Sequence, residues 1–316
     1  MFNKIYKNKD TLRNMKIAHS RLGKNLHTFF SMLIFALIFS SCDNNSIENV
    51  ERFDGRNAFD FVSQQLSFGP RVPGSIGHEL TIELIEATLI SNGWETENKS
   101  EDFNGYEVNN VIGKKGEGKP WIMIGAHYDT RIFADQESLI VNQGYPVPGA
   151  NDGGSGVGIL LELARVIPEF PAQEIWLVFF DQEDNGNING QDWIIGSTIF
   201  VEQLEDFPDK VVILDMVGDD DLNIFFEKSS DSELSNEIWG IAGELGYSEY
   251  FISEYRFNMI DDHTPFIQKG ISAIDIIDFD YPYWHTTEDT LDKISADSLE
   301  IVGSTILEWI LRNQDR

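Results

Sequence analysis

Cysteine is almost absent from this sequence, with one residue, Cys42, among 316. A single thiol cannot close a disulfide within the chain, although an exported protein could form one. The folded part must therefore take its stability from a hydrophobic core and from any metal that it binds. The 274 residues after Cys42 are enough for one large domain with a sizeable core, and no internal repeat divides them.

Basic residues are also scarce, with 23 Lys and Arg against 53 Asp and Glu, a net charge of −30. The first 42 residues contain seven of the basic residues and one of the acids, so residues 43–316 keep 16 and 52, a net charge of −36. We expect no nucleic-acid partner, because binding to phosphates needs a basic face. An acidic surface favours cationic or neutral substrates over anionic ones.

The apolar run at residues 29–39 is shorter than the roughly 20 residues that a membrane-spanning helix needs. It follows a basic lead-in and directly precedes two serines and Cys42, which is the plan of a secretory signal peptide. Cys42 stands where a bacterial lipoprotein signal is cut and its cysteine acylated. We predict a signal peptide at 1–42, a polar tether at 43–54, and export with a lipid anchor to the bacterial cell envelope, on the periplasmic side or the surface. Met15 is an alternative start.

Apolar runs between turn residues predict strands, and helical spacing predicts helices between them. Strands are predicted at 106–112, 121–125, 174–180, 211–217, 222–227 and 271–279. Helices are predicted at 54–66, 75–92, 157–167, 193–204, 232–245 and 296–311. The EIWLVFF run at 174–180 is continuously apolar, as in strands buried on both faces. The alternation predicts a single α/β domain over 55–316, with a mostly parallel sheet covered by helices on both faces.

A glycine-dense turn, GANDGGSGVG, contains Asp152 directly before the predicted helix at 157–167. Glycine lets the backbone turn sharply and approach a ligand closely, so the turn would hold this carboxylate at the start of the helix. Three further acidic motifs accompany it: GAHYDT at 125–130, DQED at 181–184 and WHTTED at 284–289. Acid-and-glycine turns are often only turns, but together these motifs predict one metal centre.

Several motif residues fall at or just beyond the carboxyl ends of predicted strands, where ligands of parallel sheets bind. They are His127, Asp129, Glu183, Asp184 and Asp215. Carboxylates with imidazole suit zinc, which takes three protein ligands in a catalytic site, whereas calcium prefers a larger cage of oxygens. A serine nucleophile is not expected, because the sequence has no G-x-S-x-G elbow.

Six motifs in this order, GAHYDT, GANDGGSG, FFDQED, ILDMVG, DDHTPF and WHTTEDT, resemble those of the zinc aminopeptidase superfamily, which also contains the glutaminyl cyclases. The resemblance runs from about Phe68 to the C-terminus. It implies a three-layer α/β sandwich in which a central, mostly parallel mixed sheet has helices on both faces. This agrees with the strands and helices predicted above.

The resemblance implies that Asp152, Asp184 and His285 bind zinc. It also implies that Glu183, next to a ligand but not on the metal, is the general acid/base. Neighbouring side chains of an extended segment point to opposite sides, so a bend could send one carboxylate of this pair to the metal and the other to the substrate.

The metal count is left open by two further positions, His127 and Asp215. In the aminopeptidases of the superfamily these positions hold a second zinc, with Asp152 bridging. Cyclases similar to the animal enzyme bind one zinc although they keep matching residues. We expect one zinc per chain.

Two positions, Asp261 and Trp284, favour the cyclase branch. Asp261, in DDHTPF, stands where cyclases place an acid that helps to bind the substrate and relay its proton, with Asp215 as a second acid. Trp284 directly precedes His285, as in cyclases, and is expected to form a pocket wall. Trp193 is the nearest candidate for the tryptophan on which cyclases stack their substrate, although it starts a predicted helix.

Two positions depart from the animal cyclases. Asp184 replaces a glutamate ligand, which shortens the reach to the metal by one methylene, and Asp275 stands where the animal enzyme has a histidine.

We therefore expect a zinc-dependent glutaminyl-peptide cyclotransferase that converts the N-terminal glutamine of peptides or proteins to pyroglutamate and releases ammonia. The alternative on the same scaffold is a zinc aminopeptidase, in which Glu183 would activate a water. A catalytically inactive binding lipoprotein is a third alternative. It is disfavoured because every expected ligand and the expected base are present.

Overall fold

A computed structural model of the chain describes residues 51–313. Its helices are α2 (Gly55–Ser67), α3 (Ile76–Ser91), α4 (Gly154–Val166), α5 (Ile195–Glu202), α6 (Ser232–Glu244), α7 (Thr264–Gln268) and α8 (Ala296–Asn313), with a 3-10 turn η1 (Leu291–Lys293). Its strands are β1 (Glu95–Phe103), β2 (Tyr106–Gly116), β3 (Lys119–His127), β4 (Gln173–Phe180), β5 (Lys210–Asp215), β6 (Ile224–Phe226), β7 (Phe251–Tyr255) and β8 (Ser272–Ile277). The predicted signal peptide and Cys42 lie outside the described residues, so the signal, the lipid anchor and the domain boundaries stay predictions.

Six strands form the central sheet in the order β1-β2-β4-β3-β5-β8. The pairs β4–β3, β3–β5 and β5–β8 are parallel, and the pairs β1–β2 and β2–β4 are antiparallel. The sheet is therefore mixed and mostly parallel in its centre, as predicted. Its central strands are buried on both faces, which explains the continuous apolar run of β4.

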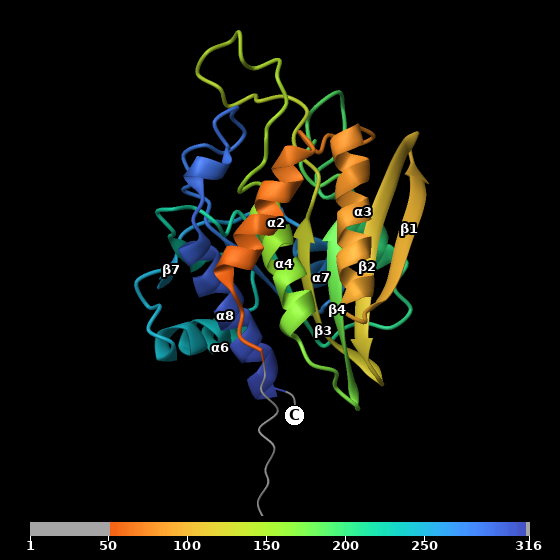
Figure 1. The fold of residues 1–316 in the computed structure, drawn as a ribbon, viewed down its shortest axis with the longest axis vertical. Helices are drawn as coiled ribbons and strands as arrows, with labels where there is room; N and C mark the ends of the chain where they lie inside the picture. The colour runs from red at the N-terminus through yellow and green to blue at the C-terminus, as the bar shows by residue number, and fades with distance from the viewer. Residues whose placement is uncertain (1–50, 314–316) are drawn as a thin grey trace, which may run out of the picture. The chain divides into compact units, whose positions relative to one another are not determined.

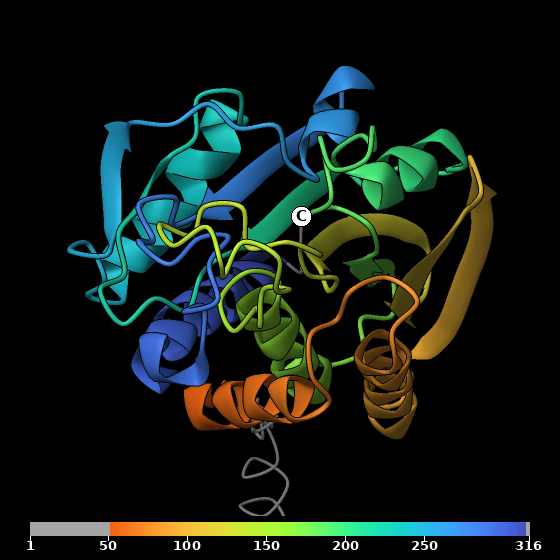
Figure 2. The ribbon, with the colours of Figure 1, turned by 90° about the horizontal axis from the view of Figure 1, so that it is seen from above.

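Helices cover both faces of this sheet (Figure 1). Helices α2, α3, α4 and α8 lie on one face, where α4 packs between α2 and the strands. Helices α5 and α7 lie on the other, as the view from above shows (Figure 2). The predicted three-layer α/β sandwich is confirmed.

Four short or polar elements were not predicted from the sequence: β1, β7, α7 and η1. The sequence of β1, ETENKSEDF, has no alternation of apolar side chains, because this strand is the sheet's edge and its side chains are exposed or half-buried. The strand predicted at 222–227 exists as β6, but it pairs with β7 in a separate two-stranded parallel sheet.

Two predicted boundaries were wrong because the backbone turns left-handed there. The helix expected from Trp193 begins at Ile195, since Ile194 has a positive φ of 53°. The strand expected to reach residue 217 ends at Asp215, since Met216 has a φ of 46°. Both turns lie beside the pocket described below. Within the described residues, no helix is long and apolar enough to cross a membrane.

Candidate zinc centre and active site

Asp152 lies in the glycine-dense turn that leads into α4, as predicted. The turn closes because Gly153 has a positive φ of 33°, and a β-carbon added there would lie 2.6 Å from the carbonyl oxygen of His127. A side chain at position 153 would push the turn away from β3. Glycine thus allows the close approach that holds the Asp152 carboxylate beside His127.

The three expected zinc ligands, Asp152, Asp184 and His285, meet at this turn from three distant segments. Nε2 of His285 lies 2.8 Å from Oδ1 of Asp184 and 3.6 Å from Oδ2 of Asp152. One donor atom from each residue lies within 4.8 Å of the others, and all three side chains are buried. This convergence is what three ligands of one ion require.

A second group with the same spacing contains His127, Asp152 and Asp215. Nε2 of His127 lies 3.2 Å from Oδ1 of Asp152 and 3.2 Å from Oδ1 of Asp215. The structure therefore brings together both ligand sets that the resemblance implied, with Asp152 common to both. The backbone N–H of Gly153 also lies 3.2 Å from this Nε2, so the ring is packed closely against the Asp152 turn.

The Asp152–Asp184–His285 group has donor atoms left over for a cation. Oδ2 of Asp152 and Oδ2 of Asp184 are buried and find no hydrogen-bond partner among the described residues. Buried carboxylate oxygens are costly unless they are paired or bind a metal. Burial, with the nearby charge of Asp152, raises the pKa of Asp184 to about 6, and a divalent cation would reverse that repulsion. Two carboxylates and an imidazole fit zinc.

The ring of His285 is positioned by Asp135, which lies beside the ring nitrogen that does not face Asp184. Its Nδ1 lies 3.4 Å from Oδ1 of Asp135, and Asp135 is itself paired with Arg131 at 2.6 Å. A carboxylate behind a ligating histidine fixes the ring's orientation. Burial opposes charging of this ring, but Asp184, Asp135 and Asp152 outweigh it and raise the pKa of His285 to about 9. Its backbone is left-handed, with a φ of 56°, which is uncommon for such a residue and typical of functional sites.

Asp129 fixes the segment that follows β4. Its carboxylate accepts the backbone N–H groups of Glu183 at 3.0 Å and of Asp184 at 3.4 Å, and it lies 3.4 Å from Nδ1 of His127. Gln182, with a φ of 55°, supplies the bend that the Glu183–Asp184 pair was expected to need. Both side chains of the pair line the same pocket.

Asp289 fixes the backbone of the turn that contains Asp152. Its buried carboxylate accepts the backbone N–H groups of Asn151 at 2.9 Å and Asp152 at 3.2 Å, and the Tyr281 hydroxyl at 2.7 Å. Arg71 is fully buried and donates to four backbone carbonyls at or near this turn. Neither residue was predicted from the sequence to have a role. Asp289 could have been suspected from its place in WHTTED, but nothing in the local sequence distinguishes Arg71.

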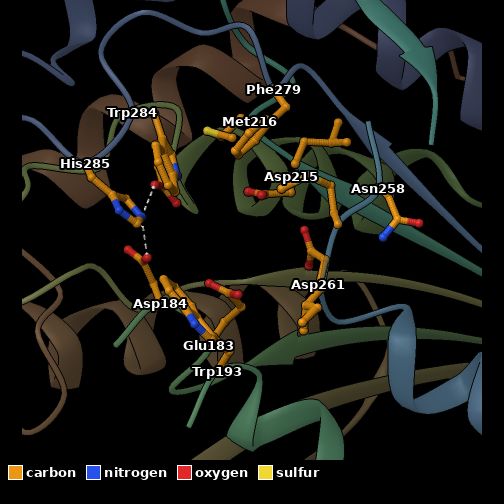
Figure 3. A pocket seen from close by; sticks show the side chains of 14 residues that line it. Glu183, Asp184, Trp193, Asp215, Met216, Asn258, Asp261, Phe279, Trp284 and His285 are labelled. Carbon is orange, nitrogen blue, oxygen red and sulfur yellow. Dashed lines mark ion pairs between the residues drawn. The ribbon is translucent and has the colours of Figure 1, made fainter. Parts of the chain in front are cut away.

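A cavity of about 290 Å³ lies beside the ligand group (Figure 3). Its apolar walls are Trp193, Met216, Met259, Ile260, Ile277, Phe279 and Trp284. Its polar lining is Asp152, Glu183, Asp184, Asp215, Asn258, Asp261 and His285. In the part of the chain that the structure describes, no lysine or arginine lines this cavity. It is therefore built for an uncharged or cationic ligand with apolar surface.

Glu183 and Asp261 enter the cavity from different segments, and Figure 3 shows both carboxyl groups directed into the same space. Burial raises the pKa of Glu183 well above its usual range, Asp261 and Asp184 add to the shift, and His127 opposes it. A carboxyl group with a raised pKa can both take up and release a proton near neutral pH, as a general acid/base must.

Both expected tryptophans line the cavity and stack on His285. The ring centroid of Trp284 lies 3.8 Å from that of His285, with 25° between the planes, and the centroid of Trp193 lies 6.1 Å away at 11°. Trp193 can take this place only because residue 186 is glycine, since a β-carbon there would lie 2.0 Å from the indole. Trp193 therefore lies at the cavity and outside the helix in which it was expected.

A carboxyl-rich group lies behind one wall of the cavity. Asp215 lines the cavity, and burial together with Asp261 raises its pKa to about 7. One oxygen of Asp275, one oxygen of Asp261 and one nitrogen of His263 lie within 4.8 Å of one another. Burial first, with Asp261 and Asp215, raises the pKa of Asp275 well above its usual range.

Comparison with known proteins places this geometry in a family. The chain is similar to a structure described as Bacteroides thetaiotaomicron glutaminyl cyclase bound to N-acetylhistamine, at 33% identity and a TM-score of 0.78 over 83% of this chain and 99% of that one. A structure described as a leucine aminopeptidase precursor from the same organism is as similar, at 33% identity and a TM-score of 0.78 over 83% and 98%. Aminopeptidase YwaD of Bacillus subtilis is 26% identical over 80% of this chain, which spans 56% of that protein's length.

These relatives carry two activities on one scaffold, in agreement with the two readings of the motifs. The sequence profile of peptidase family M28 matches residues 110–310, which include both ligand groups and every residue described as lining the cavity. The chain belongs to peptidase family M28.

Proposed function

We propose that this member of family M28 is a zinc-dependent glutaminyl-peptide cyclotransferase that closes the N-terminal glutamine of peptides or proteins to pyroglutamate and releases ammonia. The observation that carries the proposal is the pair Glu183 and Asp261. The two acids face one space beside the ligand group, among apolar walls and without a basic neighbour in the cavity lining as described. An amine and an uncharged amide on the same substrate residue match that lining. The similarity to bacterial glutaminyl cyclases supports it.

The reaction forms a bond between the substrate's α-nitrogen and its side-chain carbonyl carbon and breaks the bond to the side-chain nitrogen. Asp152, Asp184 and His285 would hold zinc, which when bound polarises that carbonyl as a Lewis acid. Glu183 takes the proton that the α-amine loses and delivers it to the departing nitrogen, so that ammonia leaves and the glutamate is restored. Asp261, with Asp215, would hold the neutral amine through its N–H groups and balance the positive charge that develops on its nitrogen during attack.

The cavity walls decide whether the amine or a water attacks. Trp284 packs on both His285 and Phe279. The ring centroids of Trp284 and Phe279 lie 5.1 Å apart. These rings and Met216 form an apolar side of the cavity. Water is disfavoured at such a surface, and the flexible glutamine side chain is confined to folded conformations that bring its amine to its carbonyl.

We further propose one zinc per chain, on Asp152, Asp184 and His285. The second group is complete, but the oxygens of Asp215 are not among the buried oxygens without a hydrogen-bond partner in the described structure, whereas Oδ2 of Asp152 and Oδ2 of Asp184 both are. Metal analysis of purified residues 43–316, after loosely held ions are removed, should give one zinc per chain and none in His285→Ala. Two tightly held zincs would favour the aminopeptidase alternative, and retained zinc in His285→Ala would overturn the ligand assignment.

The mass of the peptide product distinguishes the cyclase from the aminopeptidase. A cyclase removes only ammonia from a glutamine-initiated peptide, whereas an aminopeptidase removes the whole first residue. We expect loss of ammonia from Gln-peptides and no residue released from Leu- or Ala-peptides. Release of free leucine or alanine, with the Gln-peptide left uncyclised, would overturn the proposed function.

The place of action is also a proposal. The lone cysteine, which follows an apolar signal core and two serines, supports acylation of Cys42 and attachment to the bacterial cell envelope, on the periplasmic side or the surface. Cys42→Ser should yield a protein that is free of the membrane and takes up no labelled fatty acid. Absence of label from the natural sequence in its own host would refute the anchor.

A further inference from the structure

The rim of the active-site cavity consists of two neighbouring side chains. Of the 14 residues that line the cavity, Asn258 and Ile260 are exposed, and the other 12, all described, are buried or half-buried. Ile260 is 65% exposed although it is a large apolar residue. Because the reacting glutamine is the first residue of its peptide, the rest of the peptide must leave the cavity on its exposed side, where Asn258 and Ile260 lie.

The rim does not move freely, because Glu227 fixes the wall that carries it. Oε1 of Glu227 accepts the backbone N–H of Met259, between the two rim residues, at 2.9 Å. Oε2 accepts the backbone N–H and hydroxyl groups of Ser229 and Ser230 at 2.8 to 2.9 Å. Glu227 is itself only 2% exposed. The wall is thus anchored to the turn after β6, and the Ile260 side chain is presented at a fixed place.

Acidic groups outnumber basic ones around the rim. The cavity is lined by five carboxylates, with no lysine or arginine among its described residues, on a chain with a net charge of −30. Arg256, the nearest cation along the wall segment, is paired with Asp280 at 2.6 Å and lies over Phe225. An acidic group on a bound peptide would therefore meet repulsion that nothing at the rim offsets.

We propose that Asn258 and Ile260 form the subsite for the second residue of the substrate, and that Ile260 makes this subsite selective for an apolar side chain and against an acidic one. The inference rests on the proposed function. An apolar second residue covers the exposed isoleucine and removes apolar surface of both partners from water. A small polar residue gains nothing there, and an acidic one is repelled by the carboxylates beneath.

The test compares kcat/KM for three peptides that differ only in the second residue, Gln-Leu, Gln-Ser and Gln-Glu, each extended by the same uncharged amide-capped tail. We expect kcat/KM to be highest for Gln-Leu, lower for Gln-Ser and lowest for Gln-Glu. Ile260→Ser should lower the Leu-to-Ser ratio about three- to tenfold, the range for part of one apolar side chain at a half-open site. Because each ratio is measured on one enzyme preparation, partial unfolding cancels.

The matched control is Ile90→Ser. Ile90 is 64% exposed, but it lies in the last turn of α3 and not at the cavity, so the ratio should stay at its natural value. Asn258→Lys should raise the Glu-to-Leu ratio at low salt and lose that effect near 1 M salt, where charges are screened beyond about 3 Å. An unchanged ratio in Ile260→Ser, or the same change in Ile90→Ser, overturns the subsite while cyclisation continues. No ammonia release from any Gln-peptide overturns the proposed function, and the subsite with it.

Discussion

Single carboxyl groups at this site divide into those that face the cavity and those that hold the backbone. The side chain of Glu183 faces the cavity, and its carboxylate accepts no hydrogen bond in the described structure. Its backbone N–H, in contrast, donates to Asp129 at 3.0 Å. The side chain can therefore be changed without loosening its segment. This makes Glu183 the residue at which proton transfer can be tested separately from metal binding.

Glu183→Gln should keep zinc and lose about 10²- to 10⁴-fold in kcat, because the amide is nearly isosteric but cannot carry the proton. Zinc content, melting temperature and turnover of a Gln-peptide are measured on the same preparation. A variant that keeps more than a tenth of the natural kcat, with full zinc occupancy, would remove Glu183 from the proposed role.

Asp289 is a carboxyl group that holds the backbone, since it contacts the turn that contains Asp152 only through backbone N–H groups. Asp289→Asn replaces one acceptor oxygen by an N–H₂ group that faces those donors. We expect zinc affinity to fall about tenfold, as for other groups that orient metal ligands. Competition with a chelator measures this change.

The control for Asp289→Asn is Asp278→Asn. Asp278 is also fully buried and accepts a backbone N–H, from Asn223 at 2.8 Å, but it belongs to neither described metal group. The Asp278→Asn variant should leave zinc affinity unchanged even if it lowers the free energy of unfolding. Equal losses of affinity in the two variants would mean that Asp289 has no particular part in placing Asp152.

At the scale of elements, the wall segment between β7 and α7 depends on Glu227. Glu227→Gln should keep its oxygen toward the serine donors and turn its N–H₂ toward the Met259 N–H, which breaks that tie. We expect kcat/KM to fall about 10- to 100-fold, since small misplacements of substrate contacts have effects of this size, with zinc retained. Steady-state kinetics and metal analysis check both expectations.

Glu162→Gln is the matched control for the wall. Glu162 is equally buried and accepts the backbone N–H of Asp54 at 3.0 Å, but it joins α4 to the start of α2, away from the cavity. Both variants should lose about 1 to 3 kcal/mol of stability, the usual range for an unsatisfied buried group. Only Glu227→Gln should lose catalytic efficiency; an equal loss in Glu162→Gln would reduce the role of Glu227 to general stability.

The elements that could be predicted from the sequence are those with a strong local pattern. The apolar run of β4 and the glycine turn before α4 were found because burial and tight turns leave clear signals. The strand β1 was missed because its polar side chains have no alternation, and Trp193 was placed in a helix because the left-handed turn at Ile194 has no sequence signal. Arg71 was missed because its role depends on carbonyl groups far along the chain, at the Asp152 turn.

Across the whole molecule, the buried acids make stability depend on metal and pH. Burial first, with neighbouring carboxylates, raises the pKa of Asp184 to about 6 and of Asp215 to about 7, and neighbouring acids raise that of His285 to about 9. In each case the folded state holds its proton more tightly than the unfolded state. The metal-free protein should therefore lose stability as pH rises from about 4 to 9.

Zinc should act in the opposite direction, because it binds deprotonated ligands and so binds more tightly as pH rises. The melting temperature of the metal-free protein should be lower at pH 8.5 than at pH 6, and the gap to the zinc-bound form should be wider at pH 8.5. Thermal unfolding with and without excess zinc at the two pH values tests this. A gap that narrows with pH would show that the clustered acids do not control stability.

The polar edge strand β1 has a consequence for how copies of this chain behave when they are crowded. An unpaired strand edge is a template for another strand, and rows of such edges grow into fibres. Along β1, four acids and one lysine, Glu95, Glu97, Lys99, Glu101 and Asp102, would bring mostly like charges together if two copies joined edge to edge. The same charges that hide the strand's pattern in the sequence thus disfavour edge-to-edge pairing between copies at high local concentration.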